Sequence, residues 1–177
     1  MPRILFIKQR IRRGPAIESD IEDVIERSFR SLQGVDFDCF ELGEQLRLAE
    51  DSMRGASAQD INRARKTATG KCLQYVKDQD HSNILLLNGY LVNHFNPEFF
   101  PALHKITSRI AAWQLDDPYY VDLILPFLPY LHTVFTVDTS TIPLYQHHKI
   151  KAEWLPMASS PGISRARSAC APVAKIT

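Results

Sequence analysis

Adjacent carboxylates at Asp116 and Asp117 are the clearest candidates for chemistry in this sequence. They follow an apolar run, Arg109 to Trp113, that is typical of a buried strand, and they precede Pro118. Two neighbouring carboxylates repel each other, so the pKa of one can be raised far enough for it to work as a base. The same pair could instead cap the next helix, because aspartate is common before a proline-initiated turn. The sequence leaves both alternatives open.

Two other loops contain side chains suited to binding, and each follows an apolar run. The first loop offers guanidinium groups, which fork onto phosphate oxygens, and the second offers amide, imidazole and close backbone contacts. These residues are Arg10, Arg12 and Arg13 in the first loop, and Asn88, Gly89 and His94 in the second. Each loop also has a plainer interpretation, since charged runs are usually solvated and Asn-Gly sequences form ordinary turns.

Apolar runs typical of strands alternate along the chain with segments of helical period. Strands are expected over residues 3–8, 35–42, 83–88, 109–113, 133–137 and 151–155. Helices are expected over 18–32, over 43–80 with an interruption near Gly55, from Pro97, over 119–125 up to Pro126 and Pro129, and over 143–147. This alternation implies right-handed crossovers and a mostly parallel sheet that is covered on both faces. The sequence predicts an α/β fold, a Rossmann-like three-layer sandwich.

The predicted sandwich covers residues 1–156 as one domain. Residues 157–177 are rich in Ser, Ala and Pro and contain no acidic residue, so we expect a linker stub or disordered tail there. In an open α/β sheet, ligands bind outside the carboxyl ends of the strands, at the point where the strand order reverses. All three candidate loops follow strands, and we therefore expect them at that edge.

Composition narrows the classes of function. The net charge is +1, and all 20 acidic residues lie between Glu18 and Glu153, so only the two ends are basic. A nucleic-acid-binding protein is more often basic over a whole face, so no nucleic-acid partner is expected. No apolar stretch approaches the ~18 residues of a membrane span. Three cysteines without paired spacing suit a reducing, cytoplasmic location.

Motifs for common cofactors are missing from the sequence. Neither GxGxxG nor GxxxxGK[ST] occurs, which removes the main support for a dinucleotide or P-loop nucleotide site. His132, His147 and His148 are too loosely arranged for a metal site. No cofactor and no metal are therefore expected.

The carboxyl-terminal half resembles a known family in the order and spacing of its motifs. The segments are Asn88-Gly89, Ile110-Ala-Ala-Trp113, Asp116-Asp117-Pro118, Val134-Phe-Thr-Val-Asp138, Tyr145 and Trp154-Leu-Pro156. Residues 83–157 are similar to the N-terminal domain of CgeB-like spore-maturation glycosyltransferases. The opening strand, helix and strand are compatible with the same domain. Arginines in the first loop depart from the glycine-rich loop that is more common there.

The resemblance implies one half of a GT-B glycosyltransferase, in which two Rossmann-like domains face each other across a cleft. The N-terminal domain of such an enzyme mostly binds the sugar acceptor, and the second domain holds the nucleotide-sugar. Asp116 or Asp117 would be the base or acceptor-positioning group, with Arg12, Arg13, Asn88 and His94 around the cleft. A chain that stops near residue 177, as a truncated copy would, is expected to be inactive unless a second domain completes it. The alternative is a stand-alone, non-catalytic α/β binding or interaction module.

Overall fold

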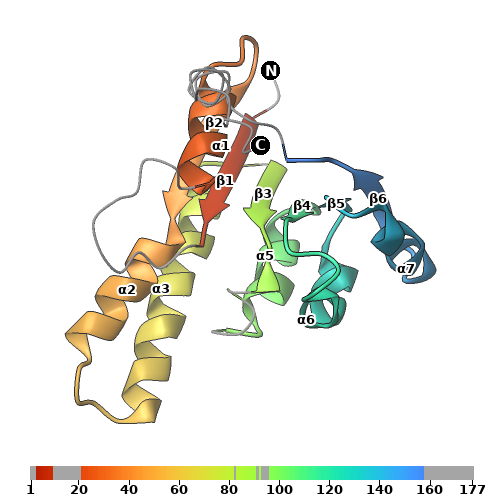
Figure 1. The fold of residues 1–177 in the computed structure, drawn as a ribbon. Coiled ribbons are helices and arrows are strands. Elements are labelled where there is room, and N and C mark those ends of the chain that lie inside the picture. The colour runs from red at the N-terminus through yellow and green to blue at the C-terminus, as the bar shows by residue number, and fades with distance from the viewer. Residues whose placement is uncertain (1–2, 10–20, 82, 91, 93–95, 158–177) are drawn as a thin grey trace, which may run out of the picture.

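A six-stranded, all-parallel sheet forms the centre of the computed structural model, which describes residues 3–9, 21–81, 83–90, 92 and 96–157 (Figure 1). The strand order is β2-β1-β3-β4-β5-β6. The strands are β1 (Arg3–Lys8), β2 (Asp36–Glu41), β3 (Asn83–Leu87), β4 (Arg109–Gln114), β5 (Thr133–Thr136) and β6 (Lys151–Trp154). The helices are α1 (Ile21–Arg30), α2 (Leu42–Ser52), α3 (Ala58–Asp78), α5 (Phe99–Ile106), α6 (Val121–Ile124) and α7 (Ile142–His147). Two 3₁₀ turns, η1 (Leu125–Tyr130) and η2 (Thr139–Thr141), complete the described elements.

The predicted α/β, Rossmann-like three-layer sandwich is confirmed, and each predicted strand is present within one or two residues of its expected bounds. The short helix expected up to Pro126 and Pro129 is α6, which ends at Ile124, and the chain then continues through both prolines as the 3₁₀ turn η1. A proline has no backbone N–H to donate, and a short 3₁₀ turn requires fewer such donors than a continued α-helix.

The two faces of the sheet are covered unequally. The chain moves from β1 to β2 in one direction and from β3 to β6 in the other, so right-handed crossovers place the connecting helices on opposite faces. One face carries the larger core, to which α2, α3, α5, η1 and α7 contribute. The opposite face carries a smaller cluster in which Ile25 and Phe29 of α1 pack against Phe6, Leu85 and their neighbours. Among the described residues, α1 is the only helix that contributes to this smaller cluster.

The ammonium group of Lys8 is buried at the carboxyl end of β1. Lys8 Nζ lies 2.6 Å from Asp23 Oδ1, 3.0 Å from Glu26 Oε2 and 2.8 Å from Glu41 Oε1, and the lysine side chain is only 3% exposed. Burial by itself would lower the pKa of Lys8, but the three carboxylates outweigh burial and raise it. Burial likewise favours a higher pKa for Glu26, and its hydrogen bonds from Lys8 and Arg30 lower that pKa below the ordinary 4.5. These contacts join α1 and β2 to the end of β1.

This network predicts a loss of stability in acid. A carboxyl whose pKa is lowered by folding contributes stability above its unfolded pKa, and that contribution disappears as the pH falls through its folded pKa. The free energy of unfolding should therefore decrease as the pH falls below about 4.5, the ordinary value for Glu26. Lys8→Met leaves three carboxylates without their shared cation and should cost about 3 kcal/mol at pH 7. Denaturant titrations at pH 7, 5 and 3 measure both effects.

The matched control for Lys8→Met is Arg54→Met, which removes a cation from an exposed pair with Asp51. Such surface pairs contribute at most ~1 kcal/mol, so this variant should follow the wild type at every pH. Equal stability of Lys8→Met and Arg54→Met at pH 7 would contradict the structural role of Lys8.

Candidate functional site

The candidate site begins at Asn88, directly after β3. Its backbone has a φ of 49°, in the left-handed region that asparagine tolerates better than most residues. The Asn88 N–H donates to Trp113 O at 2.8 Å, and Asn88 Oδ1 accepts from the Leu115 N–H at 2.7 Å. The amide is thereby fixed across the ends of β3 and β4. Its remaining donor, Nδ2, points at Asp116 and lies 2.7 Å from Asp116 Oδ2.

Asp116 is half-buried and is held through one of its two oxygens. The Tyr90 hydroxyl donates to the same Oδ2 atom, also at 2.7 Å. Burial and this hydrogen bond both raise the pKa of Tyr90, so the phenol stays protonated and remains a donor at neutral pH. Among the described residues, no donor reaches Asp116 Oδ1. The site therefore presents an oriented carboxylate with one oxygen open to accept a hydrogen bond.

Asp117 has a different environment, although it is adjacent in sequence. It is buried, and its carboxylate accepts hydrogen bonds from Thr136 Oγ1 at 2.7 Å, Thr141 Oγ1 at 3.2 Å and Tyr145 OH at 2.7 Å. Burial and the bond to Asp117 raise the pKa of Tyr145, which keeps that phenol a donor. This carboxylate joins the end of β4 to β5, η2 and α7. Its hydrogen-bonding capacity is used within the fold.

The two aspartates do not cap the helix that follows them, α6. The residue that caps α6 is Tyr120, and it makes no side-chain capping bond. Asp116 contributes only its backbone carbonyl to this turn, accepting from the Tyr119 N–H at 2.9 Å. The side chains of the pair therefore diverge, one toward Asn88 and Tyr90 and the other into the protein.

Gly89 lies beside the site but faces the core. A Cβ atom built on it would lie 3.0 Å from Phe127 Cε2 and 3.2 Å from Phe100 Cζ, so the two stacked rings occupy the space that a side chain would need. Its role is close packing of the β3 loop against α5 and η1. The other predicted binding residues, Arg10, Arg12, Arg13 and His94, lie outside the described residues.

Gln9 was missed by the sequence analysis, and it occupies the point where the strand order reverses. Its Nε2 donates to Leu87 O at 2.7 Å, and its Oε1 accepts from the Val92 N–H at 3.1 Å. The Gln9 backbone N–H donates to Glu22 Oε1 at 2.9 Å. The Gln9 side chain therefore bridges the ends of β1 and β3 and satisfies the Val92 N–H. A polar residue directly after a buried strand was the only available signal in the sequence.

Among the described residues, no three His, Cys, Asp or Glu side chains are grouped as ligands of a metal ion would be. None of the described helices combines the length and apolar character needed to cross a bilayer. No protein-family model matches the sequence, and comparison with curated proteins and with solved structures found no match.

Close packing at Gly89 predicts opposite effects for two glycine-to-alanine changes. Gly89→Ala forces a methyl group against Phe127 and Phe100 and should lower the free energy of unfolding by about 1–3 kcal/mol. Gly70→Ala places its methyl group in open space within α3 and should raise stability by roughly 0.5–1 kcal/mol. Urea titration of both variants measures the two effects. A neutral or stabilising Gly89→Ala would show that the loop does not pack as described.

The divergence of the aspartates predicts unequal stability effects. Asp117→Ala leaves the Thr136, Thr141 and Tyr145 hydroxyls without their buried acceptor and should cost about 3 kcal/mol. Asp116→Ala exposes its two donors to water in a half-buried position and should cost less than about 1 kcal/mol. Thermal unfolding of both variants tests this difference, and equal losses would contradict the separate roles.

Proposed function

We propose that the carboxyl edge formed by Asn88, Tyr90 and Asp116 binds hydroxyl groups of a sugar acceptor, and that the chain provides the acceptor side of a GT-B-like glycosyltransferase. The observation that carries this proposal is the asymmetry of Asp116. Its Oδ2 is held by two donors, whereas no described residue donates to its Oδ1. A fixed carboxylate oxygen is a suitable acceptor for the O–H group of a sugar.

The proposed chemistry uses Asp116 as a positioning group and base. An acceptor hydroxyl donates to Oδ1, its oxygen attacks the anomeric carbon of the donor sugar, and the proton passes to the carboxylate as the bond to the diphosphate breaks. Base assistance of this kind contributes typically ~10²–10⁴-fold to a rate. The donor and the leaving diphosphate belong to a second domain in this proposal.

The contacts of Gln9 favour binding of a sugar acceptor, rather than a nucleotide, at this edge of the sheet. Nucleotide phosphates in α/β proteins are usually bound by backbone N–H groups at a helix N-terminus near the reversal of strand order. In this protein the Val92 N–H next to that reversal already donates to Gln9 Oε1. The open polar group lies one strand further along, between the ends of β3 and β4.

The limited number of available polar groups at this edge favours a second candidate function. Gln9 bridges β1 and β3, and Asp117 is used within the fold, so Asp116 is the carboxylate that the described part of the site can offer a ligand. One carboxylate is sufficient for binding without catalysis. The chain would then be a non-catalytic α/β binding module. Turnover separates the two candidates, since only the glycosyltransferase releases a nucleoside diphosphate in an acceptor-dependent reaction once both domains are present.

Binding of methyl glycosides tests the proposal directly. Ligand-observed NMR with a panel of methyl glycosides should detect binding to the 177-residue chain. Asp116→Asn keeps the side-chain shape and replaces one carboxylate oxygen with an amide nitrogen, which should weaken binding at least about tenfold because a charge-assisted hydrogen bond is lost.

The matched control is Asp122→Asn, which makes the same change in charge on the exposed face of nearby α6 and should leave binding unchanged. Binding that survives Asp116→Asn, or no binding of any glycoside in the panel, would contradict an acceptor site at Asp116.

A further inference from the structure

The sheet face covered by α1 contains an apolar groove over β3, β4 and β5. Alternate residues of β4 show the contrast between the two faces: Ile110 and Ala112 are 0% exposed in the large core, whereas Ala111 and Trp113 on the opposite face are partly exposed. Phe135 of β5 is also partly exposed on this face. Parallel sheets are normally buried on both faces, so partly exposed apolar side chains here indicate a surface that takes a ligand or partner.

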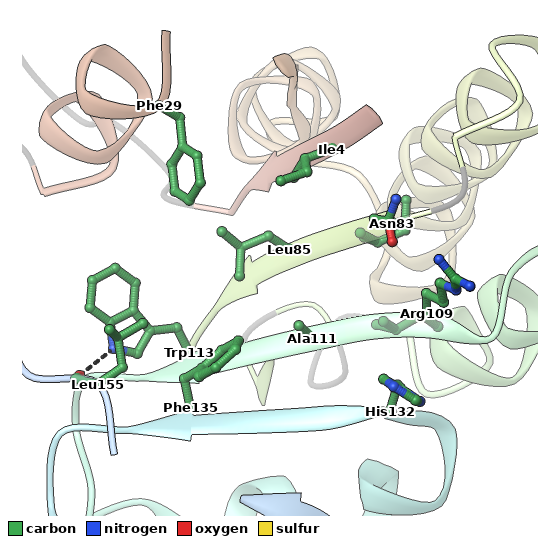
Figure 2. Close-up of a pocket in the computed structure, with 12 residues that line it drawn as sticks. Ile4, Phe29, Asn83, Leu85, Arg109, Ala111, Trp113, His132, Phe135 and Leu155 are labelled. Atoms are coloured by element: carbon green, nitrogen blue, oxygen red, sulfur yellow. Dashed lines mark hydrogen bonds between the residues drawn. The ribbon is translucent and has the colours of Figure 1, made fainter. Parts of the chain in front are cut away.

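The groove has a defined shape and size. Its volume is about 570 Å³, within the roughly 300–1,000 Å³ of small-molecule sites. Figure 2 shows Leu85 and Ala111 along its floor, with Phe29 on one side and Phe135 on the other. Leu155 lies at one end, where its carbonyl accepts a hydrogen bond from Trp113 Nε1 at 3.0 Å. The walls are therefore almost entirely apolar.

The opposite end of the groove is polar and carries the positive charge of Arg109. Arg109, at the start of β4, lies in register with Asn83 of β3, and His132 lies beside them (Figure 2). The Arg109 side chain is exposed and has no acidic partner among the described residues. Trp113 lies four positions after Arg109 on the extended strand, a distance of about 13 Å. A ligand that fits this groove has an apolar body of that length and one anionic end.

We propose that the groove binds an amphipathic carboxylate, with its apolar body along Leu85, Ala111 and Phe135 and its carboxylate on the Arg109 guanidinium. An apolar helix without acidic side chains laid over this face would remove Arg109 from water without a counter-charge, which is unfavourable. A carboxylate supplies that charge and bonds in the forked geometry of the guanidinium group. This site is independent of the proposed sugar site, because its anionic end lies at the amino ends of the strands and Asp116 lies at the carboxyl ends.

Decanoate is the probe, and Trp113 is the reporter. In a Trp154→Phe background, Trp113 is the only remaining tryptophan and lines the groove. Decanoate, kept below its micelle concentration, should shift the Trp113 emission with 1:1 stoichiometry, and its affinity should fall as salt is added. Arg109→Gln should weaken decanoate binding about tenfold, whereas decanol should bind both proteins equally weakly. Ala111→Phe fills the floor and should prevent binding of both compounds.

Arg54→Gln is the matched control, since it removes an equal charge from an exposed arginine far from the groove lining and should leave decanoate affinity unchanged. Equal affinities for decanoate and decanol, or no effect of Arg109→Gln, would overturn the proposal. So would an absence of decanoate binding. Sedimentation that shows a wild-type dimer and a monomeric Ala111→Phe variant would overturn it in favour of a second copy on this face.

Discussion

The end of β1 determines how the rest of the carboxyl edge can be used. Lys8 is surrounded by three carboxylates from α1 and β2, and Gln9 connects β1 to the end of β3 and to the Val92 N–H. These two residues use polar groups near the point where a Rossmann-like fold usually receives a phosphate. Among the described residues, a carboxylate oxygen without a donor lies at the next pair of strands, where Asn88 and Tyr90 both donate to Asp116 Oδ2.

The reversal of strand order at β1 also explains why the protein has an apolar groove. Only the crossover from β1 to β2 runs toward one edge of the sheet, so α1 alone among the described helices is placed on the second face. Its side chains, Ile25 and Phe29, reach Phe6, Leu85 and Phe37 but leave Phe135 partly exposed. The exposed apolar surface is thus a consequence of topology and does not depend on any unusual residue in β4 or β5.

Helices and strands could be predicted from the sequence where the pattern of neighbouring residues was sufficient. The apolar run of β3 and the interruption near Gly55, which has a φ of 80°, are properties of consecutive residues. Contacts between distant residues were not predictable in this way. The role of Asp117 depends on Thr136, Thr141 and Tyr145, which are 19 to 28 residues away. Nothing in the sequence distinguishes this aspartate from its neighbour.

The partly covered face of the sheet shows what the hydrophobic period of a strand cannot predict. A strand buried on both faces and a strand with one partly open apolar face both have apolar runs, and the alternation of strands and helices predicted a sheet covered on both faces. The difference appears only when the direction of each crossover is known. Gly89 illustrates the same limit, because a glycine that permits a turn and a glycine that makes room for two aromatic rings are identical in sequence.

Both proposed sites involve β4. Because successive side chains of a strand point to opposite faces, its ligand-facing residues are different from its core residues. Arg109, Ala111 and Trp113 face the groove, whereas Ile110 and Ala112 belong to the large core, and Asp116 follows the end of the strand. The core residues fix the strand, so the backbone of Arg109 at one end and the Asp116 carboxylate beyond the other end are carried by the same element. Affinity at either end depends on such fixed positions, because a preorganised group loses less entropy when a ligand binds. Substitutions on the groove side of β4 can therefore change binding while the core side continues to determine stability.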